Sequence, residues 1–406
     1  MAELNVAEET LAYRNPLDGT APLYAFVAYP LLERPLPLLI VMHGYSQGAD
    51  RMTVADVVRR FARRYGVIAA SLDLRGRGGS AGRRDSSGLE TSDIRAACEF
   101  LTAYFGYRLD QENLAILGYS GGGGNVFSAV VKCPDLFRSA FSFFGVSDYG
   151  YWFDHGAEER HRAQLIEDVG GPPSEFPERY AARSALLGVA NNRHTDIHLF
   201  WDAEEKVCPP YFNLTYAERA RSHGFDNVIL HESRPGERLR WLHGYPEERP
   251  DLVAVERFIA DALEDPHVPL VLLDPVGRLT VVGYLITKPF LVTAGTLTDC
   301  VLDLTYSIAG EAWRFLLAKQ SADPEGPAEA RASIILNRWP QGARVGLAGA
   351  RVPGPLRPAT PAAAPRVTVR PAASPEEAPW SSVRLEDTRL VIENLPLDAE
   401  VLVTPQ

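Results

Sequence analysis

The sequence is poor in cysteine and has no long hydrophobic run. Its four cysteines are scattered over 406 residues with no C-x-x-C pair, so neither a disulfide framework nor a cysteine metal site is indicated. No run of 18 or more apolar residues occurs, which argues against a membrane-spanning helix. The first ten residues contain glutamates and no apolar run, so we expect no secretory signal or transit peptide. A cytoplasmic location fits this pattern best.

A surplus of positive charge is also missing. The chain has 41 Lys and Arg residues against 52 Asp and Glu residues, a net charge of -11. Nucleic acids and anionic membrane surfaces attract positive patches, so we expect neither as the main partner. Hydrophobic residues make up 46% of the chain, which excludes wholesale disorder. The length predicts two folded units.

Residues 1–265 alternate short apolar runs with amphipathic stretches. This alternation predicts an α/β unit, a doubly wound and mostly parallel sheet with helices on both faces. A hairpin at 11–29 is expected before the first buried strand, and a last helix at 251–263. Buried strands are predicted at 36–42, 67–72, 114–117, 141–146 and 197–201.

The pattern changes after residue 265. Residues 266–406 contain short β-branched and aliphatic runs with no convincing helix, which predicts an all-β, sandwich-like domain. Eight prolines between 353 and 379 predict an extended loop there, with one strand at 366–370. The sequence leaves open whether this domain binds carbohydrate, mediates oligomerisation or covers an active site.

The strongest chemical signal is G-Y-S-G-G at residues 118–122, between a predicted strand and a predicted helix. A sharp strand-to-helix turn with a serine at its apex needs small residues on both sides. Ser120 is therefore a candidate nucleophile. The alternative is a glycine-rich turn with an incidental serine, but the flanking strand and helix favour the functional interpretation.

A serine nucleophile needs a base and an acid, which in this fold follow it in the order Ser, acid, His. His243 lies in the loop after the last predicted strand, 228–231, and before the final helix, where the base is expected. His223 and His231 are interpreted as surface or packing residues. Three carboxylates follow the strand at 197–201 and compete for the role of the acid: Asp202, Glu204 and Glu205.

Backbone amides must also hold the negative charge that develops on the attacked carbonyl oxygen. The amide of Gly121, directly after the nucleophile, is one candidate donor. The loop after the strand at 36–42 is placed to supply the second through Tyr45. His43, at the end of that strand, is interpreted as structural.

Three weaker patterns are given structural interpretations. Residues 76–81, which are rich in glycine, are expected to form a surface loop. His194, Asp196 and His198 run into a strand without a third spaced ligand, so no metal site is expected. His155 and His161 are assigned to a polar helix face. No cofactor is expected.

Several motifs together resemble the α/β-hydrolase fold, and more narrowly the catalytic domain of the prolyl oligopeptidase family of serine peptidases. Residues 73–80 look like the D-x-R-G-x-G-x-S loop of that family, and residues 118–123 like its G-x-S-x-G-G elbow. Residues 170–184 resemble its G-x-P, P-E-x-Y and S-P stretch. Residues 205–210, E-K-V-C-P-P, resemble its D-x-V-V-P-P segment, which favours Glu205 over Glu204. The resemblance covers residues 10–263.

The resemblance implies a serine hydrolase that cleaves an ester or peptide-like amide in a small molecule or short peptide. The chain departs from the family pattern in its glutamate acid, in the absence of a long region before the first buried strand, and in its additional β domain. Single-domain carboxylesterases and sugar-ester deacetylases are similar, so both remain alternatives. A binding scaffold without catalytic activity is the alternative from another class.

Overall fold

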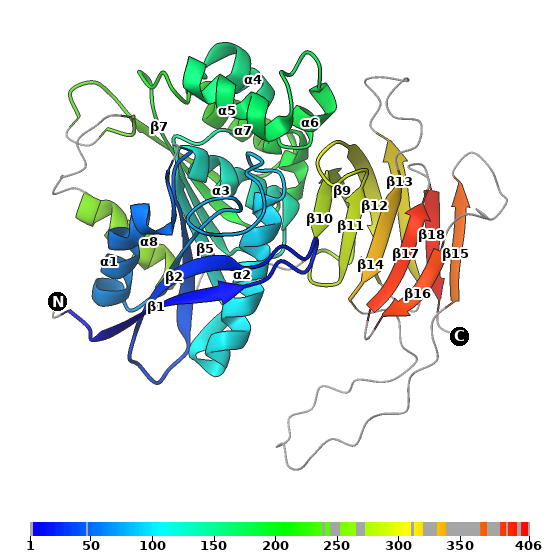
Figure 1. Ribbon diagram of the computed structural model, residues 1–406, viewed down its shortest axis with the longest axis horizontal. Helices are drawn as coiled ribbons and strands as arrows, with labels where there is room; N and C mark the ends of the chain where they lie inside the picture. Colours follow the sequence, from blue (N-terminus) through cyan, green and yellow to red (C-terminus); the bar gives the residue numbers. More distant parts are fainter. Residues whose placement is uncertain are drawn as a thin grey trace, which may run out of the picture.

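The computed structural model contains two β-sheets, each with its own core (Figure 1). We call the part built on the first sheet, residues 3–264, the α/β unit, and the part built on the second, residues 273–404, the β unit. The structure describes residues 3–45, 48–237, 240–243, 252–264, 273–309, 312–319, 331–337, 366–371, 382–386, 389–395 and 399–404.

The α/β unit is built on an eight-stranded sheet in the order β1-β2-β4-β3-β5-β6-β7-β8. The N-terminal hairpin β1–β2 is antiparallel and joins β4 in antiparallel register. The other strands are parallel to one another and lie in the sheet order β4, β3, β5, β6, β7 and β8. The strands are β1 (Val6–Tyr13), β2 (Leu23–Pro30), β3 (Leu36–Met42), β4 (Ile68–Leu72), β5 (Leu109–Tyr119), β6 (Ser139–Phe143), β7 (Asp196–Asp202) and β8 (Val228–Ser233).

Helices cover both faces of this sheet, which explains why its central strands read as continuous apolar runs. All seven residues of β3 are buried, as parallel strands between two helical layers require. Helices α1 and α8 pack on one face, and α2, α3, η3 and α7 on the other. The helices are η1 (Arg51–Val54), α1 (Ala55–Tyr65), α2 (Glu90–Phe105), η2 (Gly106–Arg108), α3 (Gly121–Lys132), α4 (Tyr149–His155), α5 (Glu159–Val169), α6 (Pro177–Ala181), η3 (Ala185–Asn191), α7 (Tyr211–Ser222) and α8 (Leu252–Glu264).

The β unit is one antiparallel sheet of ten strands that encloses a single core, in the order β15-β18-β13-β12-β9-β10-β11-β14-β17-β16. Its strands alternate between core and solvent: in β13, Trp313, Phe315 and Leu317 are buried and the residues between them are exposed. The strands are β9 (Val276–Val282), β10 (Tyr284–Ile286), β11 (Phe290–Ala294), β12 (Val301–Ser307), β13 (Trp313–Lys319), β14 (Ala332–Leu336), β15 (Arg366–Pro371), β16 (Ser382–Glu386), β17 (Arg389–Leu395) and β18 (Ala399–Thr404).

The β unit is attached to the α/β unit through polar and apolar contacts of β9 and β10. Val282 packs within the core of the α/β unit. The side-chain Nδ2 of Asn191 donates to the Thr280 carbonyl (2.7 Å), and the Asn191 Oδ1 accepts from the backbone amide of Thr280 (2.7 Å). Figure 1 shows the ten-stranded sheet beside the side of the α/β unit that carries α2 and α3, away from the outer helices α1 and α8.

The fold predicted from the sequence, an α/β-hydrolase sheet followed by an all-β, sandwich-like domain, is confirmed. The largely apolar stretch 279–286 is divided between β9 and β10 at Gly283, whose φ is +78°. The boundary at 265/266 lies outside the described residues, as do residues 353–365 and 372–379 of the proline-rich stretch. No helix among the described residues is both long and apolar enough to cross a bilayer.

The loop predicted at residues 76–81 lies only partly at the surface: Gly76, Gly78 and Gly79 are exposed. Arg77 and Ser80 are buried, and the Ser80 hydroxyl accepts a hydrogen bond from the Tyr24 amide (2.9 Å). A Cβ on Gly78 would lie 2.3 Å from the Asp73 carboxylate, which is ion-paired with Arg51. The glycines therefore allow the loop to close tightly over buried charges.

Candidate active site

Ser120 occupies the apex of a sharp turn between β5 and α3. Its φ is +56°, a conformation that non-glycine residues adopt only when their surroundings impose it. The Ser120 amide donates to the Phe143 carbonyl on β6 (2.9 Å). A Cβ on Gly118 would lie 2.2 Å from the Gly122 carbonyl oxygen, so the turn requires glycine at this position. Residues 118–122 thus form the strand-turn-helix elbow that the sequence predicted.

His243 reaches Ser120 from the loop after β8. Its Nε2 lies 2.8 Å from the Ser120 Oγ, and its Nδ1 lies 3.0 Å from Glu205 Oε1. The ring of Phe144 packs against the imidazole with a centroid separation of 4.6 Å. Phe144 has a φ of +40°, so a strained backbone places this aromatic ring beside the histidine. Residues 244–250, which follow His243, lie outside the described part of the chain.

Glu205 is buried and accepts several backbone hydrogen bonds. Its Oε1 accepts from the amides of Val207 (2.7 Å) and Cys208 (3.1 Å), and its Oε2 from the amide of His243 (2.6 Å). Burial alone would raise the pKa of Glu205, but the hydrogen bonds from the side chain and backbone of His243 lower it overall. The carboxylate is therefore ionised at neutral pH, as a partner of a protonated imidazole must be.

The two other candidate carboxylates have different partners. Asp202 is fully buried and accepts from Ser233 (2.5 Å) and from the guanidinium of Arg240 (2.6 Å). Although burial opposes ionisation, these hydrogen bonds lower the pKa of Asp202 to about 2. Glu204 is exposed and ion-paired with Arg240 (2.9 Å). Of the three, Glu205 is the carboxylate in contact with His243.

The amides of Tyr45 and Gly121 lie beside the nucleophile. A Cβ on Gly121 would lie 2.9 Å from the Tyr45 amide nitrogen, so the two backbone segments are in close contact. Neither amide donates a backbone hydrogen bond within the described part of the chain. An oxyanion hole requires two backbone donors beside the nucleophile, which is the role that the sequence predicts for these two amides. Ser46 and Gln47, the next residues of this loop, lie outside the described residues.

Several residues around the site were not identified from the sequence. Cys208 is buried and its amide donates to Glu205 Oε1 (3.1 Å). Burial raises the pKa of its thiol well above the usual value, so the thiol stays protonated. The hydroxyl of Tyr45 lies 2.5 Å from Ser86 Oγ and donates to Asp168 (3.2 Å). These contacts join segments far apart in the sequence, and no local pattern indicates them.

The other histidines considered from the sequence do not take part in the contacts that join Ser120, His243 and Glu205. His43 is fully buried, with its Nδ1 2.8 Å from the Gly44 carbonyl oxygen. His223 is exposed at the end of α7, and His231 lies in β8 beside His198 (3.0 Å). The assignment of His161 to a polar helix face is wrong.

His161 is only 8% exposed. Its ring lies 5.2 Å from Trp152 and 6.3 Å from Tyr45, between ring centroids. Burial lowers its pKa.

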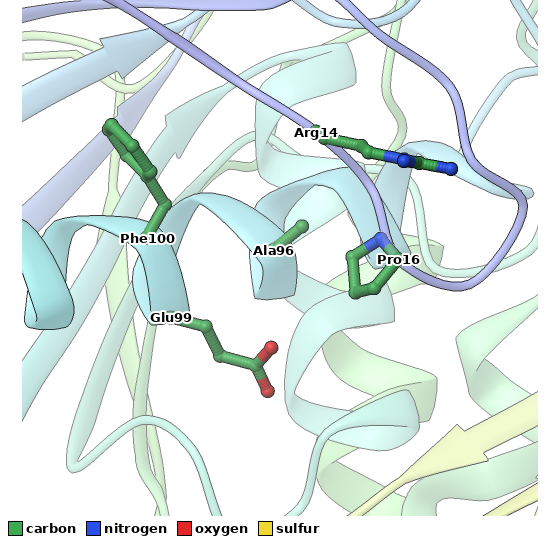
Figure 2. A pocket seen from close by; sticks show the side chains of 5 residues that line it. All are labelled: Arg14, Pro16, Ala96, Glu99 and Phe100. Atoms are coloured by element: carbon green, nitrogen blue, oxygen red, sulfur yellow. The ribbon is translucent and has the colours of Figure 1, made fainter. Parts of the chain in front are cut away.

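The described residues form no metal centre, and the groove in Figure 2 is lined by residues other than those around Ser120. Within the described residues, no three His, Cys, Asp or Glu side chains gather as metal ligands would. A shallow groove of about 400 Å³ lies between the N-terminal hairpin and α2. Figure 2 shows its lining residues, none of which belongs to the site around Ser120: Arg14, Pro16, Ala96, Glu99 and Phe100.

The fold and the Ser120, His243 and Glu205 geometry define the class of the α/β unit as a serine hydrolase of the α/β-hydrolase type. Residues 55–230 match the family model described as the prolyl oligopeptidase family. This match confirms the resemblance that the sequence motifs indicated, and with it the predicted enzyme class. Among curated protein sequences, none matches this chain.

Several solved structures are similar to this chain in fold. An acylaminoacyl peptidase in complex with Z-Gly-Gly-Phe-chloromethyl ketone has 17% identity and a TM-score of 0.52, covering 66% of this chain and 42% of its own. A puromycin hydrolase has 22% identity and a TM-score of 0.50, covering 66% of this chain and 41% of its own. A puromycin-hydrolyzing peptidase of Mycobacterium tuberculosis has 22% identity and a TM-score of 0.50, covering 63% and 38%. The chain thus spans about two fifths of the length of these proteins.

Proposed function

We propose that this chain is a serine hydrolase that cleaves an ester or a peptide-like amide through an acyl-enzyme on Ser120. The observation that carries the proposal is the continuous contact from Ser120 Oγ to His243 Nε2 (2.8 Å) and from His243 Nδ1 to Glu205 Oε1 (3.0 Å). A serine hydroxyl becomes an effective nucleophile when a base within hydrogen-bond distance takes its proton.

The reaction follows from this geometry. The Ser120 Oγ attacks the carbonyl carbon of the substrate while its proton passes to His243 Nε2, and the imidazolium is stabilised by Glu205. The carbonyl oxygen becomes an oxyanion that accepts hydrogen bonds from the amides of Tyr45 and Gly121. His243 then donates the proton to the leaving oxygen or nitrogen, and the acyl group stays on Ser120. Water, deprotonated by His243, attacks the acyl carbon. The bond from that carbon to Ser120 Oγ then breaks, His243 returns the proton to Oγ, and the acid is released.

The substrate class is an acyl ester or an aminoacyl amide in a small molecule or short peptide. The match to the prolyl oligopeptidase family supports the amide, whereas the carboxylesterase and sugar-ester deacetylase alternatives both predict the ester. A panel that compares acyl esters with aminoacyl amides of the same acyl group separates these outcomes. Hydrolysis of esters alone would contradict the peptidase interpretation.

Labelling with a fluorophosphonate probe tests the catalytic site itself. The probe phosphonylates a serine only where a base activates it. We expect stoichiometric labelling of the full chain and none of a Ser120→Ala variant. Absence of labelling in the folded wild-type protein would favour a binding scaffold without catalytic activity.

Three other expectations from the sequence stay predictions. They are the domain boundary at 265/266, the cytoplasmic location, and oligomerisation through the β unit.

A further inference from the structure

Residues 85–88, here called segment 85–88, join the active site to the β unit. Two consecutive residues of the segment adopt left-handed backbone conformations, Ser86 with φ +51° and Ser87 with φ +64°. Non-glycine residues in this region are strained and keep it only when their surroundings hold them. The contacts of the segment therefore decide its conformation.

On one side, segment 85–88 holds the side chain of Tyr45. Ser86 is buried. Its Oγ lies 2.5 Å from the Tyr45 hydroxyl oxygen and donates to Asp168 Oδ2 (2.8 Å). The Tyr45 hydroxyl also donates to the same carboxylate oxygen (3.2 Å). Because the backbone amide of Tyr45 lies beside Gly121, the position of this side chain fixes the position of a donor of the oxyanion hole.

The segment also contacts the helix that follows the nucleophile. The Ser87 hydroxyl donates to Asn125 Oδ1 on α3 (2.7 Å) and lies 2.7 Å from the Tyr149 hydroxyl on α4. Asn125 is buried in the second turn of α3. Ser86 and Ser87 thus contact the two sides of the site, the loop of Tyr45 and the helix of Ser120.

On the other side, the β unit holds the end of the segment directly. The hydroxyl of Tyr284 in β10 donates to the Gly88 carbonyl (2.7 Å). The Tyr284 ring packs on the ammonium of Lys132, the last residue of α3, at 4.5 Å from its centroid. Lys132 in turn donates to the Ala182 carbonyl (2.9 Å), so Tyr284 covers a buried cation whose partners are backbone carbonyls.

A second contact with the β unit holds the start of the segment. Arg183 is buried and donates through Nε to the Asp85 carbonyl (2.8 Å). Its Nη1 donates to the Thr298 carbonyl of the β unit (3.0 Å). Both ends of segment 85–88 are therefore connected to the β unit, the start through Arg183 and the end through Tyr284.

We propose that the β unit positions the oxyanion hole: Tyr284 holds segment 85–88 in its strained conformation, and Ser86 transmits this position to Tyr45. Tyr284 is a positioning residue because it contacts none of the reacting groups. The proposal rests on the proposed function and gives the β unit a role in the chemistry of the α/β unit. Without the Tyr284 hydrogen bond, Ser86 and Ser87 can relax, and the Tyr45 amide moves away from the developing oxyanion.

A pair of matched variants tests this role, with p-nitrophenyl acetate as the ester probe. Tyr284→Phe removes the hydroxyl that donates to Gly88 and keeps the ring on Lys132. Tyr306→Phe is the control, because the Tyr306 hydroxyl is also in the β unit and donates to a backbone carbonyl, that of Asp274 (2.9 Å). We expect Tyr284→Phe to lower kcat about 10-fold with KM nearly unchanged, less than the roughly 10² to 10³-fold cost of deleting an oxyanion donor. Tyr306→Phe should lower the melting temperature similarly without lowering kcat.

A double variant tests whether the effect travels through Ser86. Ser86→Ala should also lower kcat, and the double variant with Tyr284→Phe should lose little more than the larger single loss, because residues that act through one another are not additive. Unchanged kcat in Tyr284→Phe, or losses that multiply in the double variant, would overturn the proposal. Turnover by Ser120→Ala would instead refute the proposed function, so the two failures are distinguishable.

Discussion

Glu205 holds His243 at two points. One carboxylate oxygen contacts the imidazole Nδ1 (3.0 Å), and the other accepts the backbone amide of the same residue (2.6 Å). The acid therefore fixes both the orientation of the ring and the position of the loop that carries it. This double contact distinguishes Glu205 from Glu204, whose carboxylate pairs with Arg240.

Replacement of Ser120 by alanine should abolish turnover of whichever substrate the panel identifies. Loss of a nucleophile that acts together with its base typically lowers kcat by about 10⁴ to 10⁶-fold. Steady-state kinetics, with circular dichroism to confirm folding, measures the effect. Near wild-type turnover in a folded Ser120→Ala variant would exclude this serine as the nucleophile.

Glu205→Gln should lower kcat by about 10⁴-fold and change KM little, because a carboxamide neither fixes the required tautomer nor stabilises the imidazolium. Glu204→Gln is the matched control and should change kcat only a few fold. The reverse pattern would transfer the role to Glu204. Equal activity of both variants would place the acid elsewhere in the chain.

Asp202→Asn should affect stability more than turnover. The carboxylate is fully buried and balances the guanidinium of Arg240 (2.6 Å). Loss of a charge-assisted hydrogen bond of this kind costs about 1.5 to 3 kcal/mol. Urea denaturation should show the loss in the free energy of unfolding, while kcat stays within a few fold of wild type. A loss of kcat as large as that of Glu205→Gln would contradict this division of roles.

Acid should destabilise the protein through His43. Burial lowers the pKa of His43 to about 4, against about 6.5 in an unfolded chain. The unfolded state therefore binds the proton first, and the contribution of this residue to stability, complete above pH 6.5, is lost as the pH falls toward 4. The contribution of His43 to the free energy of unfolding should decrease by about 1.4 kcal/mol per pH unit in this window.

Urea denaturation between pH 7 and pH 4.5 measures this dependence. A His43→Asn variant should show a shallower slope, and His223→Asn, at an exposed site, should keep the wild-type slope. Equal slopes in the wild-type protein and His43→Asn would assign the acid sensitivity to other groups.

A protein truncated after residue 265 tests the predicted domain boundary. The eight-stranded sheet and α8 are complete by Glu264, so we expect a cooperative melt and labelling at Ser120. The melting temperature should fall, because Val282 and Tyr284 no longer cover the core and Lys132. An insoluble or unfolded product would mean that both units form one cooperative structure.

The sequence predicted the parts of the fold that depend on local patterns. Residues 36–42 are apolar throughout and form β3 with the predicted bounds. The elbow could be recognised because a sharp turn around a serine requires small residues, and Gly118 and Gly122 lie on either side of Ser120. Burial of polar residues was not predictable, since it depends on partners distant in the chain: Arg75, beside the loop at 76–81, pairs with Asp93 on α2 (2.6 Å).

In the candidate site, too, local patterns indicated some residues, whereas others depend on contacts distant in the chain. Ser120 and His243 stand out because the fold requires them in a set order after particular strands. His161 gave no local signal, because its burial depends on contact with Trp152 on another helix. Ser86 could not be found either, since its importance comes from a hydroxyl 41 residues earlier in the chain.

The glycines at the start of α3 have a consequence for what holds the nucleophile in place. The first four residues of the helix are all glycine, which has a low helix propensity. A Cβ on Gly122 would lie 2.5 Å from the Met42 carbonyl oxygen, so the first turn is pressed directly against the end of β3. This turn has little tendency to form by itself and gains its stability from the strands beneath it. The geometry of the nucleophile therefore depends on the central strands, because the turn that carries Ser120 is held by its contact with the end of β3.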